Sequence, residues 1–264
     1  MWPQSVIFSV PKERYQPADW EDGGGYGPYG AGFRFAVADG ATLGYESRRW
    51  VRQLLGAFLA PGDAGTPPGP ELDRESLGRW LERAQDKWLR SMPAAGDYID
   101  QLKIKQGSFA TFVGCQLDGL DGKSPPRWRA VVLGDAVLFH VREGRLLKSV
   151  PGLSAADFGT SPDGLRTPPE SLAGMVAGLD FYKGDLAPGD LLFAATDAIA
   201  KWMLTWVEKD EGVLWPALEA LMNPADFEAM IAAQRQAKVM HDDDVTLLRV
   251  RLQIRPAEKL VMFG

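Results

Sequence analysis

Four apolar segments, spread over two hundred residues, each lie directly against an aspartate. The segments are FAVADG, VVLGDA, LLFAATDA and HDDDVTLL, and the aspartates are Asp39, Asp135, Asp197 and Asp243. If each segment is a strand, the four carboxylates converge at one end of a sheet-based fold. Carboxylates held that close repel one another unless a positive charge lies between them, and a hard divalent cation is the simplest candidate. The pattern therefore predicts a sheet-rich fold with an acidic metal site.

The composition is that of a globular protein with a large core. The chain has 264 residues, of which 45% are hydrophobic and 24% are charged, so we expect one domain over residues 1–264. The net charge of −6 argues against nucleic acid or an anionic membrane as a partner. A single cysteine, Cys115, excludes an intramolecular disulfide, and with only two histidines it argues against a zinc site of the Cys/His kind. The sequence shows no signal peptide and no membrane-spanning run, so a cytoplasmic location is expected.

The first half of the chain predicts two strands followed by two helices. Residues 5–10 and 33–38 have strand character, and we expect the Gly-rich stretch 23–32 to be a flexible hairpin connection between them. Its glycine spacing matches a dinucleotide-binding loop, but that motif must open a helix, and here a strand follows. Helical spacing of apolar residues then predicts helices around 50–58 and 77–89.

The second half predicts a mixture of strands and helices. Short connections indicate that neighbouring strands pair antiparallel. Residues 151–189 lack periodicity and are interpreted as an active-site flap or a locally ordered insertion. Antiparallel strands before, between and after two groups of helices favour stacked sheets covered by helices over a parallel fold. The predicted strands are 108–117, 128–133, 136–142, 145–149, 191–196 and 245–252, and the predicted helices begin at 197 and span 225–240.

An all-carboxylate site suits Mg²⁺ or Mn²⁺. Both ions prefer oxygen ligands and keep several waters, so a few carboxylates and one backbone carbonyl are enough. Two such ions about 4 Å apart lower the pKa of a shared water and clamp a phosphoryl group for in-line attack. This chemistry needs no nucleophilic side chain, which fits a chain so poor in histidine and cysteine.

Five segments, in order, resemble the motifs of the metal-dependent protein phosphatase family, type 2C. They are FAVADGA, GSFATFVGC, WRAVVLGDAVLFHVREGRLL, GDLLFAATDAIAKWML and DDDVTLLRV, and the resemblance extends roughly from Glu21 to Leu252. It implies an α+β fold, a four-layer αββα sandwich of two antiparallel β-sheets flanked by helices.

The resemblance also implies a metal centre with Mn²⁺ or Mg²⁺, two ions with a weaker third. Asp39 takes the position of the carboxylate that bridges the two catalytic metals, and Gly40 that of the residue lending its carbonyl. Asp197 and Asp243 take the positions of further ligands, so that Asp39, Asp197 and Asp243 are the expected catalytic residues. Asp135 matches the residue that holds the third metal together with Asp197.

Glu21 and Asp22 resemble the early acidic pair of the family, which reaches a metal directly or through water. Nearby, the chain departs from the family pattern. The arginine that holds the substrate phosphate is replaced by Pro17, for which Lys12 or Arg14 could substitute. Ala41 stands where eukaryotic members have a histidine, a change shared with bacterial members. These departures leave the carboxylates intact and concern the substrate pocket.

Each acid also has a plainer interpretation. Asp39 and Asp197 each precede a predicted helix and could be turn or N-cap residues. Asp243 lies in a run of three acids, which is often a solvated charge run. Asp135 could form a tight turn between strands. His241, beside that run, could orient a carboxylate or be an exposed loop histidine.

The leading hypothesis is a Mn²⁺- or Mg²⁺-dependent phosphatase acting on phosphoserine and phosphothreonine, in which a water bridging the metals attacks phosphorus. Its partners would be a phosphorylated protein substrate and a cognate kinase system. The alternative is a catalytically degenerate type 2C-like module that binds a partner or phosphopeptide without hydrolysis. A phosphatase of small phosphoesters is a third possibility.

Overall fold

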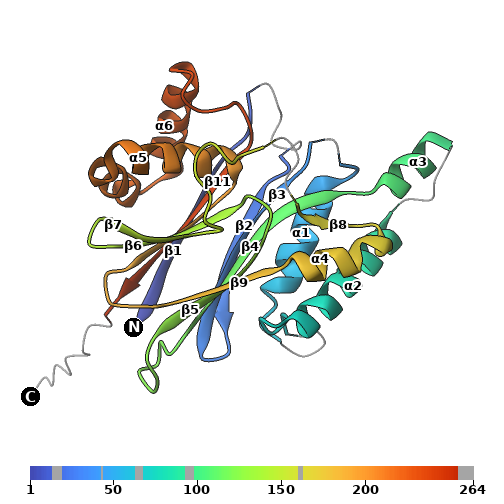
Figure 1. Ribbon diagram of the computed structural model, residues 1–264, viewed down its shortest axis with the longest axis horizontal. Coiled ribbons are helices and arrows are strands. Elements are labelled where there is room, and N and C mark those ends of the chain that lie inside the picture. Colours follow the sequence, from blue (N-terminus) through green and yellow to red (C-terminus); the bar gives the residue numbers. More distant parts are fainter. Residues whose placement is uncertain (14–19, 43, 63–67, 93–97, 160–162, 255–264) are drawn as a thin grey trace, which may run out of the picture.

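Two antiparallel sheets lie face to face with helices on their outer sides (Figure 1). The computed structural model describes residues 1–13, 20–42, 44–62, 68–92, 98–159 and 163–254. The five-stranded sheet has the order β1 (Trp2–Val10), β11 (Val245–Gln253), β10 (Leu191–Ala195), β6 (Val137–Arg142) and β7 (Arg145–Val150). The six-stranded sheet has the order β2 (Gly23–Tyr29), β3 (Gly32–Gly40), β4 (Phe109–Asp118), β5 (Arg127–Leu133) and β9 (Asp180–Asp185), and β8 (Leu165–Arg166) also pairs with β4.

The helices form two groups, one on each sheet. α1 (Ser47–Phe58), α2 (Arg74–Ser91) and α4 (Leu172–Gly178) lie on the side of the six-stranded sheet, and α5 (Asp197–Ala220) and α6 (Pro224–Gln236) lie on the five-stranded sheet (Figure 1). α3 (Tyr98–Gln106) leads into β4, and a short 3₁₀ helix, η2 (Pro169–Ser171), precedes α4. The predicted αββα sandwich is confirmed. None of the helices in the described ranges is both long and apolar enough to span a bilayer.

Alternating side chains along each strand build separate layers of core. Phe35 and Val37 of β3 pack between the sheets, while Ala36 and Ala38 face the helices. On the helix side, the ring of Phe58 lies 5.2 Å from that of Phe112. Burial of each such aromatic side chain contributes about 1.5–3 kcal/mol, so these layers fix the strand positions firmly.

A buried polar chain joins the two sheets. Trp128 of β5 donates its indole N–H to Nδ1 of His140 on β6, at 3.1 Å. Nε2 of His140 lies 2.9 Å from Asp190, which also accepts from Arg142 at 2.7 Å. Burial alone would raise the pKa of Asp190, but hydrogen bonds from Arg142 and His140 outweigh it and hold that pKa well below its usual range. The polar groups are satisfied, so they tie the sheets together at little desolvation cost.

The Gly-rich stretch 23–32 is not the flexible connection that the sequence predicted. Residues 23–29 form β2, paired with β3 in a continuous register from Gly23 opposite Ala38 to Tyr29 opposite Gly32. Glycine has low strand propensity, but here pairing with a buried neighbour decides the conformation. Only the two residues between these strands form the turn.

The segments 128–133 and 136–142 were expected to pair with each other, and this was wrong. They are β5 and β6, which belong to different sheets. The chain crosses at Gly134, whose φ is +101° and whose Cβ, if present, would lie 2.5 Å from the carbonyl oxygen of Asp163. Only glycine fits this crossing, and Asp135 follows it at the opening between the sheets.

Several helical boundaries also differ from the prediction. α3 was not predicted, and its residues carry little apolar periodicity. The helix beginning at Asp197 continues to Ala220, with a non-helical residue at Asp210. The predicted helix 225–240 ends at Gln236. The segment 151–189 is locally ordered over much of its length, since it contains β8, η2, α4 and β9.

Candidate metal centre

Four predicted ligands line one pocket of about 610 Å³ between the ends of the two sheets. Asp39 lies at the end of β3, and Asp135 lies at the crossing from β5 to β6. Asp197 follows β10, and Asp243 precedes β11. Two strands of each sheet thus deliver a carboxylate to the same opening, as the pattern of strand ends predicts.

Gly40 lines the same pocket and has a steric reason to be glycine. A Cβ at this position would lie 2.8 Å from the carbonyl oxygen of Glu21 and 3.1 Å from Cβ of Ser47. The missing side chain lets the segment with Glu21 and Asp22 pack directly against the end of β3. The close packing brings the early acidic pair next to Asp39.

Asp197 and Asp243 are held by the pairing of the segments around them. The backbone N–H of Thr196 donates to the carbonyl of Thr246 at 3.1 Å, and the Thr246 N–H donates to Oγ1 of Thr196 at 2.9 Å. Asp197 is the first residue of α5, where the helix dipole favours a negative charge. Asp243 accepts from the backbone N–H of Asp244 at 2.9 Å.

Glu21 and Asp22 do not line the 610 Å³ pocket. Asp22 lines a separate pocket and is only 9% exposed, and neither of its carboxylate oxygens has a hydrogen-bond partner in the described part of the chain. Burial, followed by repulsion from Asp22 and Asp197, raises the pKa of Asp39 well above its usual range. Burial raises the pKa of Asp22 in the same way. Repulsion from Asp22 therefore opposes the ionisation of Asp39.

Asp135 adds a further acid that lacks a partner. It is 6% exposed, and its Oδ1 forms no hydrogen bond with any described residue. Burial, followed by repulsion from Asp197, raises its pKa to about 6. Such unpartnered oxygens are costly unless a cation compensates them.

The donor set fits a hard divalent cation. All the candidate ligands offer oxygen, which Mg²⁺ and Mn²⁺ prefer. Within the described ranges, no three acidic, histidine or cysteine side chains are already arranged around one point as a ready-made site. Mg²⁺ commonly binds through one or two carboxylates and keeps several waters, so this arrangement still fits the ion.

Lys12 places a positive charge among these acids. Its Nζ lies 3.3 Å from Glu21 and 3.7 Å from Asp243, and it donates to Oγ1 of Thr42 at 2.9 Å. Lys12 is only 8% exposed. The ammonium group is therefore an internal counter-ion to two of the predicted ligands.

Asp244 has an organising role that the sequence did not reveal. Its two carboxylate oxygens accept the backbone N–H groups of Lys12 and Glu21, each at 2.9 Å. Asp244 belongs to a run of three acids, and nothing in such a run shows which acid points inward. Asp244 joins the N-terminal segment to the start of β11 and so holds Lys12 and Glu21 beside Asp243.

Among the described residues, the basic side chains that line the pocket are those of Arg166 and His241. The guanidinium of Arg166 lies 4.7 Å from the ring centre of Phe109. Arg166 comes from the segment 151–189, which the sequence predicted to be an active-site flap or a locally ordered insertion, but no motif singled out Arg166 itself. Arg14 and Pro17, considered above for phosphate binding, lie outside the described residues.

Comparison with known proteins places the fold in a defined class. No protein-family model and no curated protein sequence matches the chain. Solved structures do match. A bacterial serine phosphatase has a TM-score of 0.61 at 11% identity, with 96% of this chain and 99% of that chain covered. The catalytic domain of the serine/threonine protein phosphatase PstP, in complex with two manganese ions, has a TM-score of 0.60 at 15% identity, with 96% and 99% covered. The PPM Ser-Thr phosphatase MsPP from Mycobacterium smegmatis, in complex with cacodylate, has a TM-score of 0.58 at 15% identity, with 94% and 98% covered.

The chain thus has the fold of the PPM-type, or type 2C, serine/threonine phosphatases, over nearly its whole length and that of the matched chains. The resemblance seen in the sequence is confirmed at the level of the fold. At 11–15% identity, similarity of structure does not carry the activity with it.

Proposed function

We propose that the protein is a Mn²⁺- or Mg²⁺-dependent phosphatase of phosphoserine and phosphothreonine residues in proteins. The observation that carries this proposal is the convergence of Asp39, Asp135, Asp197 and Asp243 on one pocket of about 610 Å³. The likeness of the fold to a phosphatase that binds two manganese ions supports it.

The proposed ligands surround the inner part of the pocket. When bound, the ions would supply an acidified water and neutralise charge on the phosphoryl oxygens. Asp39 would hold both ions and the Gly40 carbonyl one of them, with Asp197 and Asp243 as further ligands. Asp135 would contribute with Asp197 to a weaker third ion. Glu21 and Asp22 would reach a metal ion directly or through water.

Basic groups of the chain itself would position the phosphorylated residue. Arg166 lines the pocket, and a guanidinium is suited to bidentate binding of phosphate. Stacking on Phe109 limits the rotamers of Arg166 and lowers the entropic cost of that binding. Of the chain's two histidines, only His241 lines the pocket, and it would be the one to give a proton to the leaving oxygen.

The substrate would be a phosphorylated protein, and a cognate kinase in the cytoplasm would be the partner that supplies it. The test is hydrolysis of a phosphothreonine peptide by the purified chain, with Mn²⁺ and with chelator. We expect turnover only with the metal, and a loss of about 100-fold or more in Asp39→Asn and Asp197→Asn. Equal turnover in chelator would overturn the proposal.

One observation favours a second candidate, a type 2C-like module that binds a phosphopeptide without hydrolysing it. The Lys12 ammonium already pairs with two of the predicted ligands, Glu21 and Asp243. Such an internal cation could take the place of a metal. Thermal melting separates the two functions, because an ion that binds only the folded state raises its stability. A melting temperature that rises with Mn²⁺ supports the enzyme, and an unchanged one supports the binding module.

A further inference from the structure

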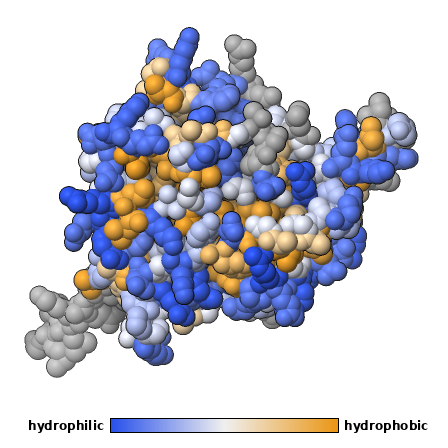
Figure 2. Space-filling view, viewed as in Figure 1, coloured by the Kyte–Doolittle hydropathy of each residue, from blue (hydrophilic) through white to orange (hydrophobic). Residues whose placement is uncertain are grey.

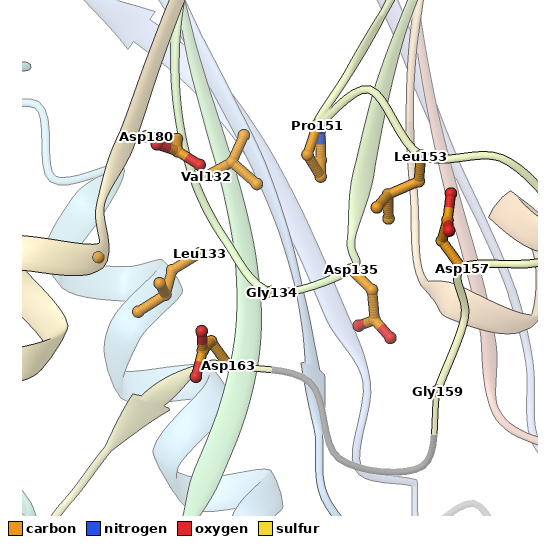
Figure 3. A pocket seen from close by; sticks show the side chains of 11 residues that line it. Val132, Leu133, Gly134, Asp135, Pro151, Leu153, Asp157, Gly159, Asp163 and Asp180 are labelled. Carbon is orange, nitrogen blue, oxygen red and sulfur yellow. The ribbon is translucent and has the colours of Figure 1, made fainter.

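A second pocket, of about 300 Å³, lies beside the candidate metal centre (Figure 3). One part of its lining is apolar, and the other is acidic without any described basic residue. Its apolar residues are Val132, Leu133, Pro151 and Leu153, and its acidic residues are Asp135, Asp157, Asp163 and Asp180.

The two pockets share Asp135 and Gly159, so they adjoin. In Figure 3 the Asp135 carboxylate projects into the space between Gly159 and Asp163. Its Oδ1 is buried and accepts no hydrogen bond from a described residue. A buried acceptor without a partner indicates that a cationic group or another donor from outside the chain completes this site.

The remaining acids of the pocket are not neutralised by the chain. Asp157 accepts from the N–H and hydroxyl of Ser154 at 2.8 and 2.7 Å, and these bonds hold its carboxylate in place. Asp163 and Asp180 are exposed, and neither forms an ion pair with the described residues. The pocket therefore presents several negative charges around one space.

Acidic groups beside apolar walls suit a long basic side chain better than a bare metal ion. Lysine and arginine bury their methylene groups along apolar surface and direct N–H donors to carboxylates. Leu153 and Pro151 would contact the methylene groups, and Asp135 and the exposed acids would accept from the charged end.

We infer that this second pocket binds an arginine or lysine side chain of the phosphorylated protein while the phosphorylated residue occupies the larger pocket. The inference rests on the proposed function and gives it a substrate class, phosphoproteins with a basic residue near the phosphorylated one.

The experiment uses a set of phosphothreonine peptides, each with a single arginine. The arginine is moved through the three positions before and the three positions after the phosphothreonine, and a peptide with alanine at all these positions is the reference. kcat/KM and binding by calorimetry are measured with Mn²⁺ present. We expect at least one arginine peptide to exceed the reference about tenfold, mainly through KM and the dissociation constant. In the variant carrying Asp163→Asn and Asp180→Asn, the ratio of kcat/KM for the arginine peptide to kcat/KM for the reference should fall to nearly one. The control variant, Asp86→Asn with Asp121→Asn, removes the same charge outside both pockets and should keep the ratio.

The outcomes separate the two claims. Hydrolysis of all peptides without preference for arginine overturns the inference and leaves the phosphatase. No hydrolysis, but tighter binding of an arginine peptide that the Asp163/Asp180 variant loses, supports the inference and overturns the proposed enzyme. No hydrolysis and no difference in binding overturns both. The inference is also overturned if the control variant lowers the preference for the arginine peptide as much as the Asp163/Asp180 variant does. It is overturned as well if the Asp163/Asp180 variant changes only the affinity for Mn²⁺.

Discussion

The ammonium nitrogen of Lys12 lies 3.3 Å from a carboxylate oxygen of Glu21 and 3.7 Å from one of Asp243. Burial alone would lower the pKa of Lys12, but the charges of Asp244, Glu21 and Asp243 outweigh it and raise that pKa. The group therefore stays positive at neutral pH. It relieves repulsion among the acids and at the same time competes with any metal for the same oxygens.

This competition predicts that Lys12→Gln binds Mn²⁺ more tightly. Removal of one positive charge beside two predicted ligands should lower the Mn²⁺ dissociation constant about fivefold, which corresponds to about 1 kcal/mol. Isothermal titration calorimetry measures this directly. Lys12→Arg, which keeps the charge, is the matched control. Unchanged or weaker binding in Lys12→Gln would show that Lys12 does not oppose the metal.

Asp39→Asn should stabilise the metal-free protein. Desolvation of the Asp39 carboxyl group, followed by repulsion from Asp22 and Asp197, raises the cost of ionising Asp39. Replacement of this carboxyl group should raise the free energy of unfolding by on the order of 1 kcal/mol, because acidic residues arranged to bind a metal destabilise the metal-free fold. Urea unfolding in chelator tests this, and repetition with Mn²⁺ should show no further gain in the variant. A destabilised Asp39→Asn would contradict the account of mutual repulsion.

The two neighbours Asp242 and Asp244 should differ in their effect on stability. Asp244 is 4% exposed and accepts the N–H groups of Lys12 and Glu21. Asp242 is half-exposed, accepts one exposed N–H from Glu13 and forms a longer ion pair with Arg235 at 3.5 Å, which solvent weakens. Asp244→Ala removes the acceptor of two backbone N–H groups and should cost about 2 kcal/mol of unfolding free energy, as measured by urea denaturation. Asp242→Ala should cost less than about 1 kcal/mol. Equal costs would contradict the organising role of Asp244.

The Asp190 carboxylate should stabilise the folded protein to an extent that depends on pH. Its pKa in the folded protein lies below the value in the unfolded chain, because Arg142 and His140 donate to the carboxylate. Its contribution is therefore present above the unfolded pKa of about 4 and is lost as the pH falls through the folded value. Asp190→Asn should cost about 2 kcal/mol at pH 7 and at pH 5, and less at pH 3. Urea unfolding at these three pH values measures the difference, and a penalty that grows at low pH would contradict the assignment.

The sequence was sufficient to predict the candidate ligands that lie at the ends of strands. An apolar run that ends at an acid marks a strand end, so Asp39, Asp197 and Asp243 could be assigned to one opening before the structure was known. The αββα arrangement followed from the family resemblance and from the order of helices and strands. Both are local signals repeated along the chain.

What the sequence did not show depends on contacts between distant segments. β2 is a strand because β3 pairs with it, although its residues are mostly glycine. The crossing at Gly134 separates two strands that a short connection would normally pair. The inward direction of Asp244 and the pocket position of Arg166 depend on residues far away in the sequence, so no local pattern carries them.

Hydrolysis of p-nitrophenyl phosphate tests the central claim most directly. The purified chain is assayed with Mn²⁺ and with chelator, beside Asp39→Asn and Asp197→Asn, and with folding of each variant confirmed by circular dichroism. We predict turnover that requires Mn²⁺ and disappears in both variants. A folded, Mn²⁺-saturated wild-type protein without turnover would contradict the claim and favour the binding module.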